Sequence, residues 1–168
     1  ALNYTEARKI LEAAQRQKAV TMVPFTYSFL PMNQKIKSLL SDGFLGDPYH
    51  LNFRYFADFG RSAEYRWRFD QKYAGSGSLG DIGSHFIYLA VWFFGSVTHV
   101  WAELNTITKR PELDPSGRAY SQTDDFSIIV LTFSNGAKGV VQATAMAHEP
   151  SPWGQSHYFD LHGSGGTL

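Results

Sequence analysis

The chain contains no cysteine, no run of like charges and no apolar stretch of the about 18 residues expected of a membrane-spanning helix. The lack of cysteine excludes disulfides and thiolate metal sites, and it is typical of a protein kept in a reducing compartment. Acidic and basic residues number 15 each, so a net charge of zero gives no indication of a polyanionic partner. We therefore expect a soluble, cytoplasmic protein with no nucleic-acid or membrane partner.

Apolar and aromatic residues are plentiful instead. They make up 43% and 15% of the 168 residues, enough to bury one sizeable core. This length predicts one domain with room for a piece of a second.

The first 23 residues predict a helix followed by a short strand. Residues 5–17 have small and aliphatic side chains on one face and charged ones on the other. Residues 19–23 form an apolar run that is typical of a buried strand. Since such a unit cannot bury its own faces, residues 1–23 look like the end of a larger α/β domain.

The remaining residues predict one helix over 31–41 and several half-buried strands. Apolar and polar residues alternate over 49–58, 97–108, 124–133, 137–148 and 156–162, the period of an antiparallel sheet. Asn135-Gly136 predicts a tight hairpin between two of these strands, with positive φ angles at both residues. The glycines at 163–166 predict a further turn, after which Leu168 would open another strand.

A glycine-rich loop over residues 75–80 runs into an apolar helix predicted over residues 82–94. Asp81 stands where an N-cap oxygen would accept the first free backbone N–H groups. Asp81, His85 and Tyr88 share one side of this helix, so a carboxylate and an imidazole project one turn apart. The spacing predicts a candidate acid/base pair, although a capping Asp and a hydrogen-bonded core His would give the same pattern.

Gly75, Gly77 and Gly80 match the G-x-G-x-x-G fingerprint of dinucleotide-binding proteins. That fingerprint follows a buried apolar strand, whereas residues 68–74 are mostly polar, so we reject it as a phosphate loop. No cofactor-binding residue is therefore expected in this chain. Six scattered histidines lack the spacing of metal ligands, and we expect neither a metal site nor a metal-dependent hydrolase.

Several motifs, in order along the chain, together resemble the C-terminal domain of the Gfo/Idh/MocA family of oxidoreductases. They are Tyr-x-Phe-x-Pro at 27–31, Gly-Phe-Leu-Gly at 43–46, Trp67-Arg68, Leu-x-Asp-x-Gly-x-His at 79–85, Asp124-Asp125, Asn135-Gly136 and Gly-x-x-Gly-Thr-Leu at 163–168.

The resemblance implies an α+β fold with an open, mainly antiparallel sheet and helices on one face, over residues 24–168. Residues 1–23 would then be the C-terminal remnant of a Rossmann domain. The full protein would be an NAD(P)-dependent oxidoreductase of a sugar, polyol or related carbinol. Its cofactor, NAD or NADP, would depend on glycines and a lysine that precede Ala1, so the chain alone would bind no cofactor and be inactive.

The same resemblance implies roles for particular residues. Asp81 and His85 would hold the substrate carbinol and relay its proton, as catalytic residues. The implied substrate-binding residues are Trp67, Arg68, Tyr27 and Tyr88. Trp67 and Arg68 suit stacking on a sugar and hydrogen bonding to it, although a Trp that anchors the sheet edge fits the sequence equally well.

Two departures from the family pattern leave an alternative open. Tyr88 stands where an acidic residue is frequent, and Ser28 stands where a basic one is frequent. The alternative is a non-catalytic sugar-binding or scaffold protein that retains the fold. The substrate, the choice between NAD and NADP and the number of subunits also stay open. Trp101 and Phe56 are predicted on the face of the sheet opposite the helices, and we expect a homo-oligomer built through this open face.

Overall fold

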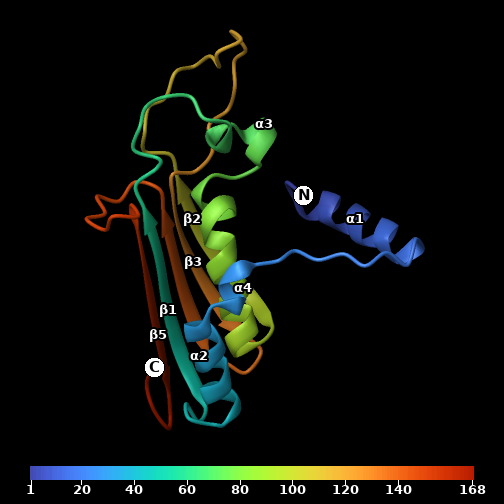
Figure 1. Cartoon of the computed structure of the whole chain (residues 1–168), viewed down its shortest axis with the longest axis vertical. Helices are drawn as coiled ribbons and strands as arrows, with labels where there is room; N and C mark the ends of the chain where they lie inside the picture. Colours follow the sequence, from blue (N-terminus) through green and yellow to red (C-terminus); the bar gives the residue numbers. More distant parts are fainter.

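The computed structural model describes all 168 residues. They form a five-stranded sheet with helices on one face, and an N-terminal arm lies beside this body (Figure 1). The strands lie in the order β2-β3-β4-β1-β5, and every pair is antiparallel except β1 with β4. The predicted α+β fold with an open, mainly antiparallel sheet is confirmed. The strands are β1 Pro48–Ala57, β2 Val97–Asn105, β3 Phe126–Phe133, β4 Lys138–Thr144 and β5 Gln155–Gly163.

The helices α2 and α4 lie on one face of this sheet (Figure 1). Helix α2 begins at Pro31, as predicted, because a proline at the first helical position has no N–H to leave unpaired. None of the helices is long and apolar enough to cross a membrane. The helical elements are α1 Tyr4–Arg16, η1 Thr26–Phe29, α2 Pro31–Ser41, η2 Trp67–Phe69, α3 Gln71–Ala74, the π-helical turn η3 Leu79–Gly83 and α4 Ser84–Phe94.

The hydrophobic core lies between α4 and the central strands. Phe86 and Leu89 of α4 are fully buried, and they face Phe53 of β1 and Val141 of β4 in one cluster. A buried side chain of this size contributes about 1.5–3 kcal/mol relative to an exposed one. This packing fixes the position and direction of α4, and with it the residues at its N-terminal end.

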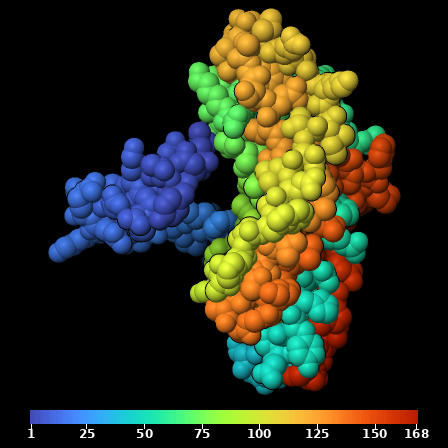
Figure 2. Space-filling view, turned by 180° about the vertical axis from the view of Figure 1, so that it is seen from behind, coloured from blue at the N-terminus to red at the C-terminus, as the bar shows by residue number.

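The opposite face of the sheet has no helix over it (Figure 2). Trp101 pairs with Val130 in the β2–β3 ladder, and both lie on this face together with Phe56 and Arg54 of β1. The indole of Trp101 is 56% exposed. The predicted placement of Trp101 and Phe56 opposite the helices agrees with the structure.

The β3–β4 hairpin forms where Asn135-Gly136 predicted it, with a difference in detail. Only Gly136 has a positive φ, of 89°, while the Asn135 side chain accepts a hydrogen bond from the Ala137 N–H at 3.0 Å. At the end of the chain, Leu161 and Leu168 exchange two backbone hydrogen bonds. The predicted turn over the glycines at 163–166 therefore forms, and the residues on its two sides pair with each other.

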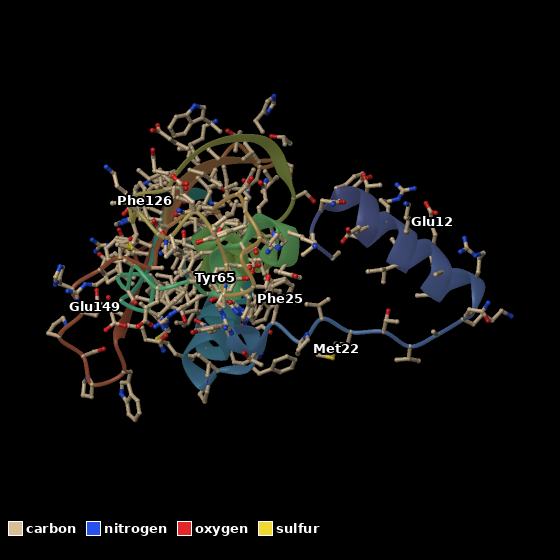
Figure 3. The ribbon with its side chains drawn as sticks, turned by 90° about the horizontal axis from the view of Figure 1, so that it is seen from above. Glu12, Met22, Phe25, Tyr65, Phe126 and Glu149 are labelled. Carbon is tan, nitrogen blue, oxygen red and sulfur yellow. The ribbon has the colours of Figure 1, made fainter.

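The N-terminal arm corrects one prediction. Helix α1 forms, but residues 19–23 are not a strand: they run without a pairing partner, and Val20 is fully exposed. Figure 3 shows Met22 midway along this arm and Phe25 where the arm reaches the body. The apolar pattern specifies burial, but a strand needs a neighbour to pair with, and no strand of this chain lies beside these residues.

Candidate active site

A buried carboxylate holds the glycine-rich loop in place. Asp124 accepts hydrogen bonds from the N–H of Gly77 at 2.7 Å, the N–H of Leu79 at 2.7 Å and the Ser78 hydroxyl at 2.8 Å. The backbone amides that would cradle a phosphate are therefore already bound to a negative charge of the chain itself. These residues do not fit a dinucleotide phosphate, which agrees with the rejection of the glycine fingerprint.

Asp81 is not the N-cap of its helix, and that prediction was wrong. Helix α4 begins at Ser84 with Gly83 in the capping position, and Asp81 already lies inside the π-helical turn η3. The reason is that helical hydrogen bonding starts earlier, since the Asp81 N–H donates to the Gly77 carbonyl at 2.9 Å. The carboxylate of Asp81 is thus free of the backbone and pairs with Arg68, whose Nε lies 3.3 Å from Oδ2.

Asp81 and Arg68 line a hollow of about 270 Å³ between the glycine-rich loop and the start of the chain. The Arg68 guanidinium lies over the Trp67 ring, 4.7 Å from its centroid, and Trp67 itself is 52% exposed on η2. This arrangement gives the hollow an aromatic face, a cation and a carboxylate. The remaining lining residues are Ala1, Leu2, Tyr73, Ala74, Ser76 and Gly80.

His85 lies one turn beyond Asp81 and packs against the residues that follow the arm. Its ring centroid lies 5.0 Å from that of Tyr27 and 5.8 Å from that of Phe25, and Phe25 stacks on Tyr88 at 4.4 Å. His85 Nδ1 is buried without a hydrogen-bond partner. Burial lowers the pKa of the His85 imidazole, and the nearby Asp81 carboxylate opposes this shift. A neutral imidazole at pH 7 can accept a proton.

The hydroxyl of Tyr27, which does not line the hollow, belongs to a chain of hydrogen-bonded side chains. It lies 2.9 Å from the Tyr55 hydroxyl, which donates to Gln155 Oε1 at 2.8 Å, and it lies 3.3 Å from Nε2 of His157. Burial raises the pKa of the Tyr55 hydroxyl, and the hydrogen bond with Tyr27 adds to this effect.

The structure brings the six predicted site residues into two adjacent groups on one side of α4. The first surrounds the hollow and consists of Asp81 with Trp67 and Arg68. The second is aromatic and consists of His85, Tyr27 and Tyr88. A hollow of about 580 Å³ around Lys109 and Tyr120 is larger, but none of the six lines it. No three potential ligand side chains converge to hold a metal ion.

Sequence reasoning assigned no role to Phe25, Asp124 or His157. A signal for His157 was available, because it alternates with Phe159 and Leu161 and therefore points to the same side of β5, although His157 itself is exposed at the end of that row. Asp124 stands in the Asp124-Asp125 motif, but nothing local to position 124 indicates that its carboxylate reaches Gly77.

Comparison with known proteins defines the class. The family model described as the GFO/IDH/MocA C-terminal domain matches residues 33–168, and the chain belongs to this family. Over 97% of its length the chain is 30% identical to levoglucosan dehydrogenase of Pseudarthrobacter phenanthrenivorans, covering 45% of that protein. Over its whole length it is 25% identical to D-apiose dehydrogenase of Paraburkholderia graminis, covering 41% of it.

The fold likeness is equally close. A structure of levoglucosan dehydrogenase in complex with NADH and levoglucosan superimposes on 99% of this chain with a TM-score of 0.89, at 30% identity, and the chain covers 44% of that structure. The family resemblance of the sequence is thus confirmed. The chain spans less than half the length of the curated relatives it matches.

Proposed function

We propose that this chain is the substrate-binding half of a nicotinamide-dependent oxidoreductase that acts on a sugar, a polyol or a related carbinol. The observation that carries the proposal is the pairing of Asp81 with Arg68 at the rim of a hollow, one turn from His85. Relatives named as levoglucosan and D-apiose dehydrogenases support the substrate class. In this division residues 1–23 belong to a Rossmann domain, and residues 24–168 form the substrate domain.

The chemistry needs a base at the carbinol. Oxidation removes a hydride from the carbinol carbon and a proton from its hydroxyl, and the nicotinamide of the full protein supplies the hydride acceptor. His85 is the base, because its pKa is lowered by burial and its imidazole is free to take the proton. Asp81 stabilises the resulting imidazolium from one turn away and orients the substrate hydroxyl.

Substrate binding falls to the aromatic and cationic groups around this pair. The exposed ring of Trp67 offers an apolar face for a sugar ring, and Arg68 offers several N–H donors to its hydroxyls. Tyr27 and Tyr88 belong to the aromatic group around His85 and would contact the part of the substrate nearest to it. A neutral polyhydroxy compound fits a hollow whose carboxylate and guanidinium already balance each other.

Cofactor binding belongs to residues outside this chain, and the cofactor is NAD or NADP. A related structure that contains NADH supports the nicotinamide class. The chain alone therefore has no catalytic activity. We place the full protein in the cytoplasm.

We also propose that the chain associates with copies of itself through the open face of the sheet. Trp101 is exposed there, with Phe56, Phe126, Ile128, Val130 and Val140 on the same face. A two-fold contact would cover the same patch on both subunits.

The proposal is tested by comparing the full protein with this chain. The full protein should reduce NAD or NADP with at least one member of a panel of aldoses, anhydrosugars and polyols, and it should bind the nucleotide in calorimetry. The chain alone should do neither. A full protein that binds a sugar but never reduces the nucleotide would favour the non-catalytic alternative, and nucleotide binding by the chain alone would refute the division of roles.

A further inference from the structure

His157 of β5 takes part in a hydrogen-bonded chain whose direction is determined by its last member. Gln155 Oε1 only accepts, so the Tyr55 hydroxyl donates to it at 2.8 Å. The Tyr27 hydroxyl donates in turn to the Tyr55 oxygen at 2.9 Å. The only hydroxyl proton of Tyr27 is therefore already used in this bond. In the 3.3 Å contact between His157 and Tyr27, Nε2 of His157 must then be the donor and the Tyr27 oxygen the acceptor.

These hydrogen bonds hold the Tyr27 side chain between two imidazoles. The Tyr27 ring centroid lies 5.1 Å from that of His157 and 5.0 Å from that of His85. Tyr55 supports the arrangement from β1, where its ring lies 4.4 Å from that of His157. The sheet thereby fixes a side chain of the candidate site through residues that do not line the hollow around Asp81 and Arg68.

The surroundings of the two imidazoles disfavour two positive charges. Tyr27, Tyr55 and Phe86 pack against the His157 ring, and none of them carries a charge that could balance an imidazolium. Asp81 is the one carboxylate that affects His85, from one turn back on the same helical segment, and it is shared with Arg68. Burial lowers the pKa of His157, and the proximity of His85 lowers it further.

We propose that His157 is a positioning residue of the candidate site, which holds Tyr27 against His85 and stays neutral while His85 is protonated. Its meaning for catalysis rests on the proposed function. When His85 takes the proton of the carbinol hydroxyl, His157 stays neutral and keeps its Nε2–H on the Tyr27 oxygen. Protonation of His157 would instead oppose proton uptake by His85.

The direct test follows the imidazole resonances of this chain by NMR during a pH titration. His85→Asn removes the titrating group that packs on the other side of Tyr27. We expect the titration midpoint of His157 to move to higher pH in this variant, because the charge of His85 no longer opposes protonation of His157. His162→Gln is the matched control, since it lies on the same strand as His157 but stacks on His50. That control should leave the His157 midpoint unchanged.

Tyr27→Phe provides a second variant that keeps both imidazoles and the ring between them. The His157 midpoint should fall, because its imidazolium loses the hydroxyl that accepts from it. A His157 midpoint that is the same in wild type and in His85→Asn would overturn the coupling of the two imidazoles, and an unchanged His157 midpoint in Tyr27→Phe would overturn the positioning role.

The full protein gives a readout that a merely structural role would not move. In His157→Leu, which cannot donate to Tyr27, kcat/KM should fall, and His157→Gln, whose amide N–H can still donate to Tyr27, should restore most of it. Equal losses in the two variants would contradict the proposal. A full protein with no oxidoreductase activity would refute the proposed function alone, because the NMR titration of the chain would still report the paired imidazoles.

Discussion

The Asp124 carboxylate accepts the backbone N–H of Gly77 at 2.7 Å, while the Asp124 carbonyl oxygen occupies the space that a Cβ at position 77 would need. The glycine-rich loop and the segment just before β3 thus meet backbone to backbone, with no room for a side chain at position 77. This contact sets the start of η3 and therefore the position of Asp81.

Gly77→Ala should consequently destabilise the chain. The added methyl group meets backbone atoms of Asp124 that cannot move without breaking the loop, and we expect a loss of about 2–4 kcal/mol in the free energy of unfolding. Gly80→Ala is the matched control in the same loop, because its methyl group meets only the hydroxyl end of Ser76. Denaturant unfolding gives the free energy of unfolding of both variants. Equal losses in Gly77→Ala and Gly80→Ala would contradict the close contact between Gly77 and Asp124.

The Arg110–Asp125 ion pair is fully buried, with a separation of 2.7 Å, and the guanidinium also lies 3.7 Å from the Phe69 ring centroid. Arg110→Met should cost about 3–5 kcal/mol of unfolding free energy, because it leaves a buried carboxylate without its cation. Arg8→Met removes a guanidinium from an exposed pair on α1 and should have no measurable effect. Urea titrations of the two variants compare their free energies of unfolding. A small loss for Arg110→Met would show that the N–H groups of Ile107 and Thr108, which donate to Asp125 Oδ2 at 2.8 Å, satisfy this carboxylate without the cation.

Stability should depend on pH through the two histidines of the site. Burial lowers the pKa of His85 and of His157 below the ordinary value of 6.5, so below that pH the unfolded chain binds more protons than the folded one. The contribution of these two histidines to the free energy of unfolding is complete above about pH 6.5, and it is lost as the pH falls through their pKa values in the folded state. The urea midpoint should therefore be lower at about pH 5.5 than at about pH 7.5. A double variant, His85→Asn with His157→Gln, should weaken this dependence, and an equally steep one would contradict it.

Association through the open face can be tested on a single strand. Trp101 points to the open face of β2, whereas its neighbour Val100 points to the other face and is similarly exposed, at 62% against 56%. Trp101→Glu should abolish a dimer seen by sedimentation at micromolar concentration, because it places a charge in the contact. Val100→Glu should leave the dimer intact. A wild-type chain that sediments as a monomer refutes the proposal.

The sequence predicted correctly those features that depend on residues close together in the chain. The start of α2 at Pro31 and the β3–β4 hairpin follow from the backbone preferences of proline and of Asn-Gly. Alternation placed Trp101 correctly on the open face, because the side chains of a strand alternate whatever its partners are. Helical spacing placed Asp81 and His85 on the same side of one helical segment, and in the structure Asp81 lies close enough to affect the pKa of His85 and pairs with Arg68.

The failures share one cause, which is distance along the chain. The N-cap interpretation of Asp81 failed because the hydrogen bonds of η3 begin in a loop that Asp124 fixes from more than 40 residues away. The strand over residues 19–23 failed because pairing depends on a neighbouring strand. The link from Tyr27 to His157 joins residues 130 positions apart, and no spacing rule reaches that far.

The role of His85 as the base is tested most directly by the rate of nicotinamide reduction in a single turnover of the full protein, using the sugar or polyol that it oxidises fastest. His85→Asn should slow this step about 10²–10⁴-fold, because the hydroxyl proton loses its acceptor. Nucleotide affinity should stay unchanged, and His148→Asn, which alters an exposed histidine, should turn over at the wild-type rate. A wild-type rate in His85→Asn would contradict the assignment of His85 as the base.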